Sequence, residues 1–415
     1  MTVPSPLPVE KRFDRASIWQ LVLGVFGVTL ALLSAAVLTV VVLTSKNVNS
    51  QNLPFLFWLL ILLILLATPS IIFASRRLSG RYSKSLWVDN KSLVIIAAAS
   101  LCWVGLLYAG NNAANWNISS TLVAPLTILV IAIPVLLLVT VSLYRLNAGS
   151  KQRVWGLITA TTFGSTQIIL FAELTLFASV LIIGFIWLSG QSEFAPYLNL
   201  FSAQKSLSIN NLQSLVSEIS PLINKPDLYA VILLIFCLFA PLIEEAFKPL
   251  AVWFLAGKKL TPVQGFAAGV ICGATFGVLE SISMVSMASG SAWVPTVVAR
   301  IGTGLLHTFT AGMSGWALAK TWQDHRYWRI SLMYAGAVLL HGLWNLFAIL
   351  LGASKITLPV QSIFLKDLMG ASGWVLLGMT VVMFAGLVWM NSHFRKHSLP
   401  PVLPDIPVEI STSTN

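Results

Sequence analysis

Residues 228–256 read LYAVILLIFCLFAPLIEEAFKPLAVWFLA. The stretch is long enough to cross a bilayer as a helix, because about 20 apolar residues span the hydrocarbon core. Its middle nevertheless carries Glu244, Glu245 and Lys248. A charge at the centre of a membrane helix costs roughly 2.5–3.5 kcal/mol on insertion scales, so such groups normally face the interior of a helix bundle. This segment therefore predicts a membrane protein with a buried polar centre.

The composition of the whole chain supports the same class of protein. Of its 415 residues, 57% are hydrophobic and 9% are charged, whereas a soluble domain has about 25% charged residues. Lipid cannot satisfy the backbone of an open strand, so the apolar segments are expected to be helices. We predict an all-α, polytopic transmembrane helix bundle of about ten spans, at 18–44, 53–75, 92–110, 121–144, 165–189, 228–256, 264–288, 300–320, 330–351 and 371–391.

The net charge of +11 is explained by membrane topology. If the N-terminus is cytoplasmic, about 18 of the 25 basic residues fall in segments on the inner side, as the positive-inside rule expects. The pattern indicates an integral protein of the cell membrane with both termini in the cytoplasm, and it gives no reason to expect a nucleic-acid partner. The three cysteines, all within apolar spans, form no disulfide framework.

The distribution of ionisable residues divides the chain into regions. We expect a five-span transmembrane scaffold at 18–190, an extracytoplasmic loop at 191–227 with a possible amphipathic helix, and a four-span catalytic core at 228–351. A last span with its flanks follows at 352–397. The polar, proline-containing tails at 1–17 and 398–415 are expected to be disordered.

Each of the three spans after 228–256 has an ionisable residue near its centre, namely Glu280, His307 and His341. Their similar depth predicts that they meet Glu244 and Glu245 in one buried cluster. Glycines at 265, 269, 273 and 277 let a neighbouring helix approach closely, and they turn Glu280 toward that neighbour.

Two further patterns concern the helices that carry the cluster. Pro241 and Pro249 flank the paired acids, and each removes a backbone donor, which predicts a kinked or locally open helix. Lys248 follows Glu244 by four residues, and Asn345 follows His341 by four, so each pair shares a helix face.

The ordered motifs Glu244-Glu245-x-x-Lys248, Phe276-Gly277-x-x-Glu280, His307 and His341-Gly342-x-x-Asn345 resemble those of PrsW-type intramembrane proteases. That family is related to the CAAX prenyl protease and bacteriocin-processing group. The resemblance covers about 240–350 and implies cleavage of a membrane-embedded or membrane-anchored protein or peptide, with the lipid bilayer as surroundings. Ser281 departs from the pattern, because the family often has asparagine at that position.

Peptide hydrolysis needs an activated water, a donor for the oxyanion and a proton for the leaving amine. We expect Glu244 or Glu245 to be the general base, Lys248 to pair with one of them, and Asn345 to bind the oxyanion or orient the site. Two mechanisms stay open. In one, His307, His341 and Glu280 hold zinc. In the other, no metal binds, and the histidines orient and protonate.

Other functions are also compatible with parts of the sequence. Gly312-Met313-Ser314-Gly315 and Gly370-Ala371-Ser372-Gly373 match the GxSG motif of rhomboid serine proteases, with Ser314 and His341 as a possible dyad, although small-residue packing explains both. Buried glutamates and histidines also occur in proton-coupled transporters, and a sensor without catalysis is a third class. Glu173, in the fifth span, is expected to make an interhelical hydrogen bond.

Overall fold

The computed structural model describes residues 15–44, 53–113, 116, 119–190, 226–288, 290–354 and 363–397. The expected amphipathic helix in the loop 191–227, most of both tails and the centre of a possible glycosylation sequon at 117–119 lie outside the described residues.

The described chain is almost entirely helical, and nine of its helical segments are long and apolar enough to cross a membrane. They are α1 (Arg15–Thr44), α2 (Leu53–Leu78), α3 (Asn90–Asn111), α4 (Ser120–Leu143), α5 (Lys151–Ala160) continued by η2 (Thr161–Ser165) and α6 (Thr166–Ser189), α9 (Pro226–Leu234) continued by η5 (Ile235–Phe239), α10 (Ala240–Phe247) and α11 (Leu250–Trp253), α12 (Pro262–Ser286), α14 (Trp328–Ala353) and α15 (Ile363–His397). The predicted span at 300–320 lies in the 32-residue α13 (Trp293–Asp324), a long helix that is not among those nine. The prediction of a polytopic all-α bundle is confirmed.

The fifth span begins earlier than predicted. The helical segment Lys151–Trp187 is continuous, so Lys151 and Arg153, which we expected in a loop, belong to its first turns. Residues Thr161–Ser165 form a π-helical turn within it. We placed the start of this span at 165, but the helix also includes the polar residues Thr161 and Thr162, which are buried.

A two-stranded antiparallel sheet is the one non-helical feature of regular structure among the described residues, and the sequence did not predict it. Strand β1 (Ser85–Trp87) pairs in antiparallel fashion with β2 (Asn147–Ser150) and links the α2–α3 loop to the α4–α5 loop. Gly149 adopts φ +92°, a conformation that residues with a side chain rarely take. Such short strands carry too few residues for an alternating pattern to be visible.

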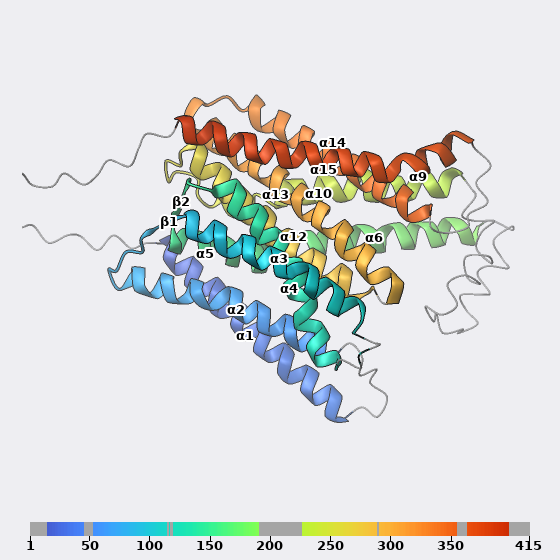
Figure 1. Ribbon diagram of the computed structural model, residues 1–415, viewed down its shortest axis with the longest axis horizontal. Helices are drawn as coiled ribbons and strands as arrows, with labels where there is room; N and C mark the ends of the chain where they lie inside the picture. Colours follow the sequence, from blue (N-terminus) through green and yellow to red (C-terminus); the bar gives the residue numbers. More distant parts are fainter. Residues whose placement is uncertain are drawn as a thin grey trace, which may run out of the picture.

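Helices α12 and α13 form the most extensive helix pair and lie between α1 and α2 on one side and α14 and α15 on the other (Figure 1). The glycine stripe of α12 explains their close approach. A Cβ atom at Gly269 would collide with the carbonyl oxygen of Ala311, and one at Gly273 would collide with that of His307. The stripe therefore faces α13 and turns Glu280 toward that helix, as the sequence predicted.

The helix with the paired acids is interrupted at both prolines. Residues Ile235–Phe239 form the π-helical η5 directly before Pro241, and α10 ends at Phe247, directly before Lys248 and Pro249. Both interruptions follow from the missing proline N–H group. They leave Glu244 and Glu245 on a helix of eight residues that packs against α6 and α14.

Candidate active site

Four helical segments bring six ionisable side chains together. Glu244, Glu245 and Lys248 come from α10 and its end, Glu280 from α12, His307 from α13 and His341 from α14. All except Glu280 are buried, and the side chain of Glu280 is 24% exposed. The predicted convergence of these residues is thus present in the structure.

Lys248 lies at the centre of the cluster and is fully buried. Its Nζ is 3.0 Å from Oε2 of Glu244 and 2.7 Å from Oε1 of Glu245. The same nitrogen lies 2.6 Å from Nδ1 of His307. Phe276 covers this group, with Nζ 5.1 Å from its ring centre. Lys248 was predicted to pair with one of the two glutamates; in the structure it pairs with both, and it also contacts His307.

Each histidine is held by a carboxylate. Nε2 of His307 is 2.7 Å from Oε2 of Glu280, and Nδ1 of His341 is 2.8 Å from Oε1 of Glu245. If each of these nitrogens carries the ring proton, Nδ1 of His307 and Nε2 of His341 are left with free lone pairs. A carboxylate behind a histidine in this way is the usual arrangement at metal sites, where it fixes the ring and its tautomer.

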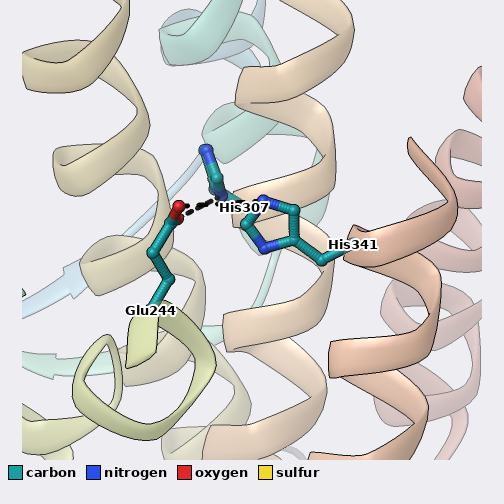
Figure 2. Close-up of side chains that lie close together, drawn as sticks. All are labelled: Glu244, His307 and His341. Atoms are coloured by element: carbon teal, nitrogen blue, oxygen red, sulfur yellow. Dashed lines mark ion pairs between the residues drawn. The ribbon is translucent and has the colours of Figure 1, made fainter. Parts of the chain in front are cut away.

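The ring nitrogens that do not contact these carboxylates, Nδ1 of His307 and Nε2 of His341, face Glu244. Nδ1 of His307 is 3.9 Å from Oε2 of Glu244, and Nε2 of His341 is 3.9 Å from Oε1. Figure 2 shows the three side chains pointing toward one another from three helices. One ligand atom from each lies within 4.8 Å of the other two. Glu244, His307 and His341 are therefore the group that could hold a metal ion.

These distances can be compared with those of a zinc site. Tetrahedral zinc with bonds of about 2.0–2.2 Å separates its ligand atoms by about 3.3–3.5 Å. The two 3.9 Å distances would have to shorten by roughly half an ångström, and atoms as far apart as the 4.8 Å limit would have to shorten by more than about 1 Å, which side-chain rotation can supply. Oε2 of Glu244 is buried without a hydrogen bond of good geometry, although Lys248 is near. The residues thus fit a divalent ion, provided that Lys248 moves away from Nδ1 of His307.

Glu280 occupies a different place from the one in the predicted zinc set. It lies behind the ring of His307, on Nε2, and it also pairs with Arg300. The group near enough to share an ion contains Glu244 in its place. The sequence could not separate these two glutamates, because both lie at the same depth of the bundle.

Arg300 is a component of the site that the sequence analysis missed. Its Nη2 is 2.5 Å from Oε2 of Glu280, and its Nε donates to Oγ of Ser281 over 3.0 Å. We had counted it as a basic residue near a helix end. Its spacing of seven residues from His307 was a usable signal, because two helical turns bring residues to the same face.

Asn345 does not point its amide nitrogen at the cluster. Its Nδ2 donates to the carbonyl oxygen of Phe236 over 2.8 Å. In η5 the N–H of Ala240 bonds to Ile235, so Phe236 would need the N–H of the next residue, Pro241, which has none. Asn345 therefore satisfies a carbonyl that the proline leaves without a partner, and the orienting role is the one that this contact supports.

Helix α6, which carries Glu173, packs against α10, and the carboxyl groups of Glu173 and Glu244 interact across this contact. An interhelical hydrogen bond of Glu173 stays a prediction. Helix α6 precedes the four-helix core, so the N-terminal spans also reach the site.

The serine alternative lacks its dyad. Ser314 is buried in α13, two turns beyond His307, and among the described residues no hydrogen bond joins it to His341. Ser372 bonds to the carbonyl of Leu368 in its own helix. Gly315 packs directly on Gly265 and Gly269 of α12, so small-residue packing accounts for the first GxSG motif.

Comparison with known proteins identifies the region that carries the cluster. Residues 197–388, a little under half of the chain, match the family described as PrsW family intramembrane metalloprotease. No curated protein and no solved structure matched significantly. The matched range includes all six cluster residues, Arg300 and Asn345, whereas Glu173 lies outside it. The sequence motifs and the family match agree: residues 197–388 of this integral membrane protein are similar to the PrsW-type intramembrane proteases.

Proposed function

We propose that this protease cleaves a peptide bond of a membrane-embedded or membrane-anchored protein, and that Glu244 is its catalytic carboxylate. The observation that carries this proposal is the convergence of Glu244 with Nδ1 of His307, which also contacts Lys248, and with Nε2 of His341, each ring being held at its other nitrogen by a carboxylate. The scissile bond would enter the space between these three groups.

Glu244 suits the catalytic role better than Glu245. Oε1 of Glu245 already binds both Lys248 and His341, and the residue is only 1% exposed. Glu244 is slightly more exposed, and neither of its oxygens holds a histidine as closely as Oε1 of Glu245 holds His341. Glu245 therefore positions His341 and balances the charge of Lys248. Glu244 is the carboxylate that activates the attacking water.

A divalent metal would be held by Glu244, Nδ1 of His307 and Nε2 of His341. When bound, an ion such as zinc would polarise the scissile carbonyl and acidify a water molecule. The charges of the site favour such an ion, because Glu244, Glu245 and Glu280 face only two basic side chains, Lys248 and Arg300. The family description supports the metal, and the choice of zinc is part of the proposal.

The protein's own groups can carry the protons. One oxygen of Glu244 takes a proton from the attacking water, whose oxygen forms the new bond to the carbonyl carbon. As the carbon–nitrogen bond breaks, Glu244 returns that proton to the leaving amine. Lys248 lies 3.0 Å from Glu244 and can donate a hydrogen bond to the developing oxyanion.

The arrangement in the membrane completes the proposal. Residues 228–351 form the catalytic core and 18–190 a scaffold that touches it through α6. Both termini lie in the cytoplasm, and the protein resides in the cell membrane. This topology is supported by the distribution of basic residues and can be tested by labelling of single cysteines placed in the loop 191–227, which would react only from outside.

The decisive experiment uses the purified chain in vesicles with a single-pass membrane protein as candidate substrate. Wild type should release a cut product, and Glu244→Gln should release none while it still inserts and folds. Prolonged chelation should abolish cleavage, and zinc should restore it. Cleavage that survives complete removal of metal would favour the metal-free mechanism. Proton flux without any cut product would instead support a transporter.

A further inference from the structure

We propose that Arg300 is a positioning residue of the protease: it locks the carboxylate of Glu280 and thereby fixes the ring of His307. The inference rests on the proposed role of His307, and it assigns a function to a residue outside the motif set. Among the described residues, Arg300 has no ion pair or hydrogen bond with Glu244 or His341; of its two partners, Glu280 and Ser281, Glu280 is the one that contacts a histidine of the site.

The contact has the form of a two-point clamp. Nη2 of Arg300 forms an ion pair with Oε2 of Glu280 over 2.5 Å, without the geometry of a hydrogen bond, and Nε donates to Oγ of the next residue, Ser281, over 3.0 Å. Ser281 is fully buried. A guanidinium group has a rigid, planar set of donors, so two anchors define its orientation. One side chain of α13, Arg300, therefore contacts two adjacent side chains of α12, Glu280 and Ser281.

The same oxygen of Glu280 continues the chain to the site. Oε2 is 2.7 Å from Nε2 of His307, whose Nδ1 faces Lys248 and Glu244. Arg300, Glu280 and His307 thus form a linear relay of contacts that ends at the reaction space. Without Arg300, Glu280 would lose its only cationic partner other than His307 among the described residues, and its partly exposed side chain could rotate toward water.

The alternative is that Arg300 is an ordinary basic residue near the membrane surface. Arginines of that kind extend their head groups into water. Arg300 instead has a side chain that is only 14% exposed, and its head group points at α12. Burial of a guanidinium is costly unless it is paired and hydrogen-bonded. The pairing with Glu280 and Ser281 provides that compensation, and the histidine beyond Glu280 gives it a function.

The test compares Arg300→Gln, Arg300→Lys, Glu280→Gln and the double variant Arg300→Gln/Glu280→Gln in the full chain. Cleavage of the single-pass substrate gives kcat and KM, and competition with a chromophoric chelator gives zinc affinity. Arg329→Gln is the matched control, because Arg329 pairs with Asp324 at the far end of α13. It should cleave and bind zinc like wild type.

Loss of a residue that supports a metal-ligating histidine typically costs 10–100-fold in metal affinity or activity. We expect Arg300→Gln to lose this much in kcat and in zinc affinity with KM unchanged. Arg300→Lys keeps the charge but not both anchors, and should fall between Arg300→Gln and wild type. The double variant should be no worse than Glu280→Gln, because Arg300 has no effect except through Glu280.

Wild-type kcat and zinc affinity in Arg300→Gln would overturn the inference, and so would additive losses in the double variant. If Arg300→Gln does not fold, Arg300→Lys decides in the same way, since an unchanged kcat there would count against the clamp. Failure of the proposed function is a separate outcome, recognised when Glu244→Gln cleaves like wild type. An inactive Glu244→Gln with a fully active Arg300→Gln would refute the clamp alone.

Discussion

Nζ of Lys248 lies 2.6 Å from Nδ1 of His307, in the space that Glu244 shares with both histidines. One buried ammonium thus contacts two carboxylates and an imidazole at the place where the side chains could hold a metal ion. A cation is needed at this place whether or not a metal ion is bound, because the carboxylates of Glu244 and Glu245 both face it.

Replacement of Lys248 by methionine should be strongly destabilising. Removal of one partner of a buried ion pair typically costs about 3–5 kcal/mol, because it leaves an uncompensated charge. We expect zinc to restore much of this loss, since a divalent ion would take over the charge balance. Thermal unfolding with and without zinc checks this. Lys320→Met, which breaks a surface pair with Asp324, should change little and should not respond to zinc.

The paired glutamates should give different phenotypes. Glu244→Gln should insert and unfold like wild type but lose about 10²–10⁴-fold in kcat, the usual loss for a general base. Glu245→Gln should mainly lose stability, because its carboxylate holds both Lys248 and His341. Measured kcat and melting temperatures of both variants decide the assignment. Full activity of Glu244→Gln would exclude it as the base.

Asn345→Ala should lower stability more than it lowers the catalytic rate. The substitution leaves the carbonyl of Phe236 without this donor, and hydrogen bonds between membrane helices are typically worth about 0.6–1.7 kcal/mol. If Asn345 were instead an oxyanion donor, kcat would fall by about 10²–10³-fold at unchanged stability. Melting temperature and kcat, measured on the same preparation, distinguish the two roles.

Glu173 offers a test of whether the N-terminal spans matter for the site. If Glu173 donates a hydrogen bond to Glu244, Glu173→Gln keeps that donor and should retain cleavage, whereas Glu173→Leu removes it and should reduce kcat. Ser179→Ala on the same helix is the control, because Ser179 bonds only to the carbonyl of Thr175. Equal rates in all three variants would show that the contact with Glu244 is not used.

The glycine stripe should not tolerate a methyl group. In Gly269→Ala the new Cβ would press against the carbonyl of Ala311 and force α12 away from α13. Overpacking of this kind typically costs about 1–3 kcal/mol. Gly184→Ala on α6 is the matched control, since nothing lies within 4 Å of a Cβ there. A melting temperature as high in Gly269→Ala as in Gly184→Ala would contradict the close packing.

The fold class could be predicted from the sequence because long apolar segments allow only helices in lipid. The glycine spacing in α12 also predicted the direction of Glu280 correctly, since a period of four places the glycines on nearly one face. The sheet of β1 and β2 could not be predicted, because three or four residues are too few to show the alternation of apolar and polar side chains that marks a strand. The early start of the fifth span was missed because Lys151 and Arg153 resemble loop residues.

The sequence predicted which residues meet in the candidate site better than it predicted which of their atoms contact each other. Depth along a helix follows from counting residues, and it grouped Glu244, Glu280, His307 and His341. Which nitrogen of a histidine faces which carboxylate depends on the rotation of four helices about their axes, and sequence spacing constrains this only within one helix. We counted Arg300 only as a basic residue of the outer segments, because a single basic residue near the end of a membrane helix usually lies at the membrane surface.

The close packing of α12 and α13 has a consequence for how a substrate reaches the site. Backbones in such near contact, without intervening side chains, move as one rigid body, so Glu280 and His307 keep their relation during any opening. We therefore expect a transmembrane substrate to be admitted by movement of the other elements around the site: α6, the interrupted helix with η5 and α10, and α14. That helix is interrupted on both sides of Glu244, at Pro241 and Pro249, so bending there would move the proposed catalytic carboxylate together with the entrance.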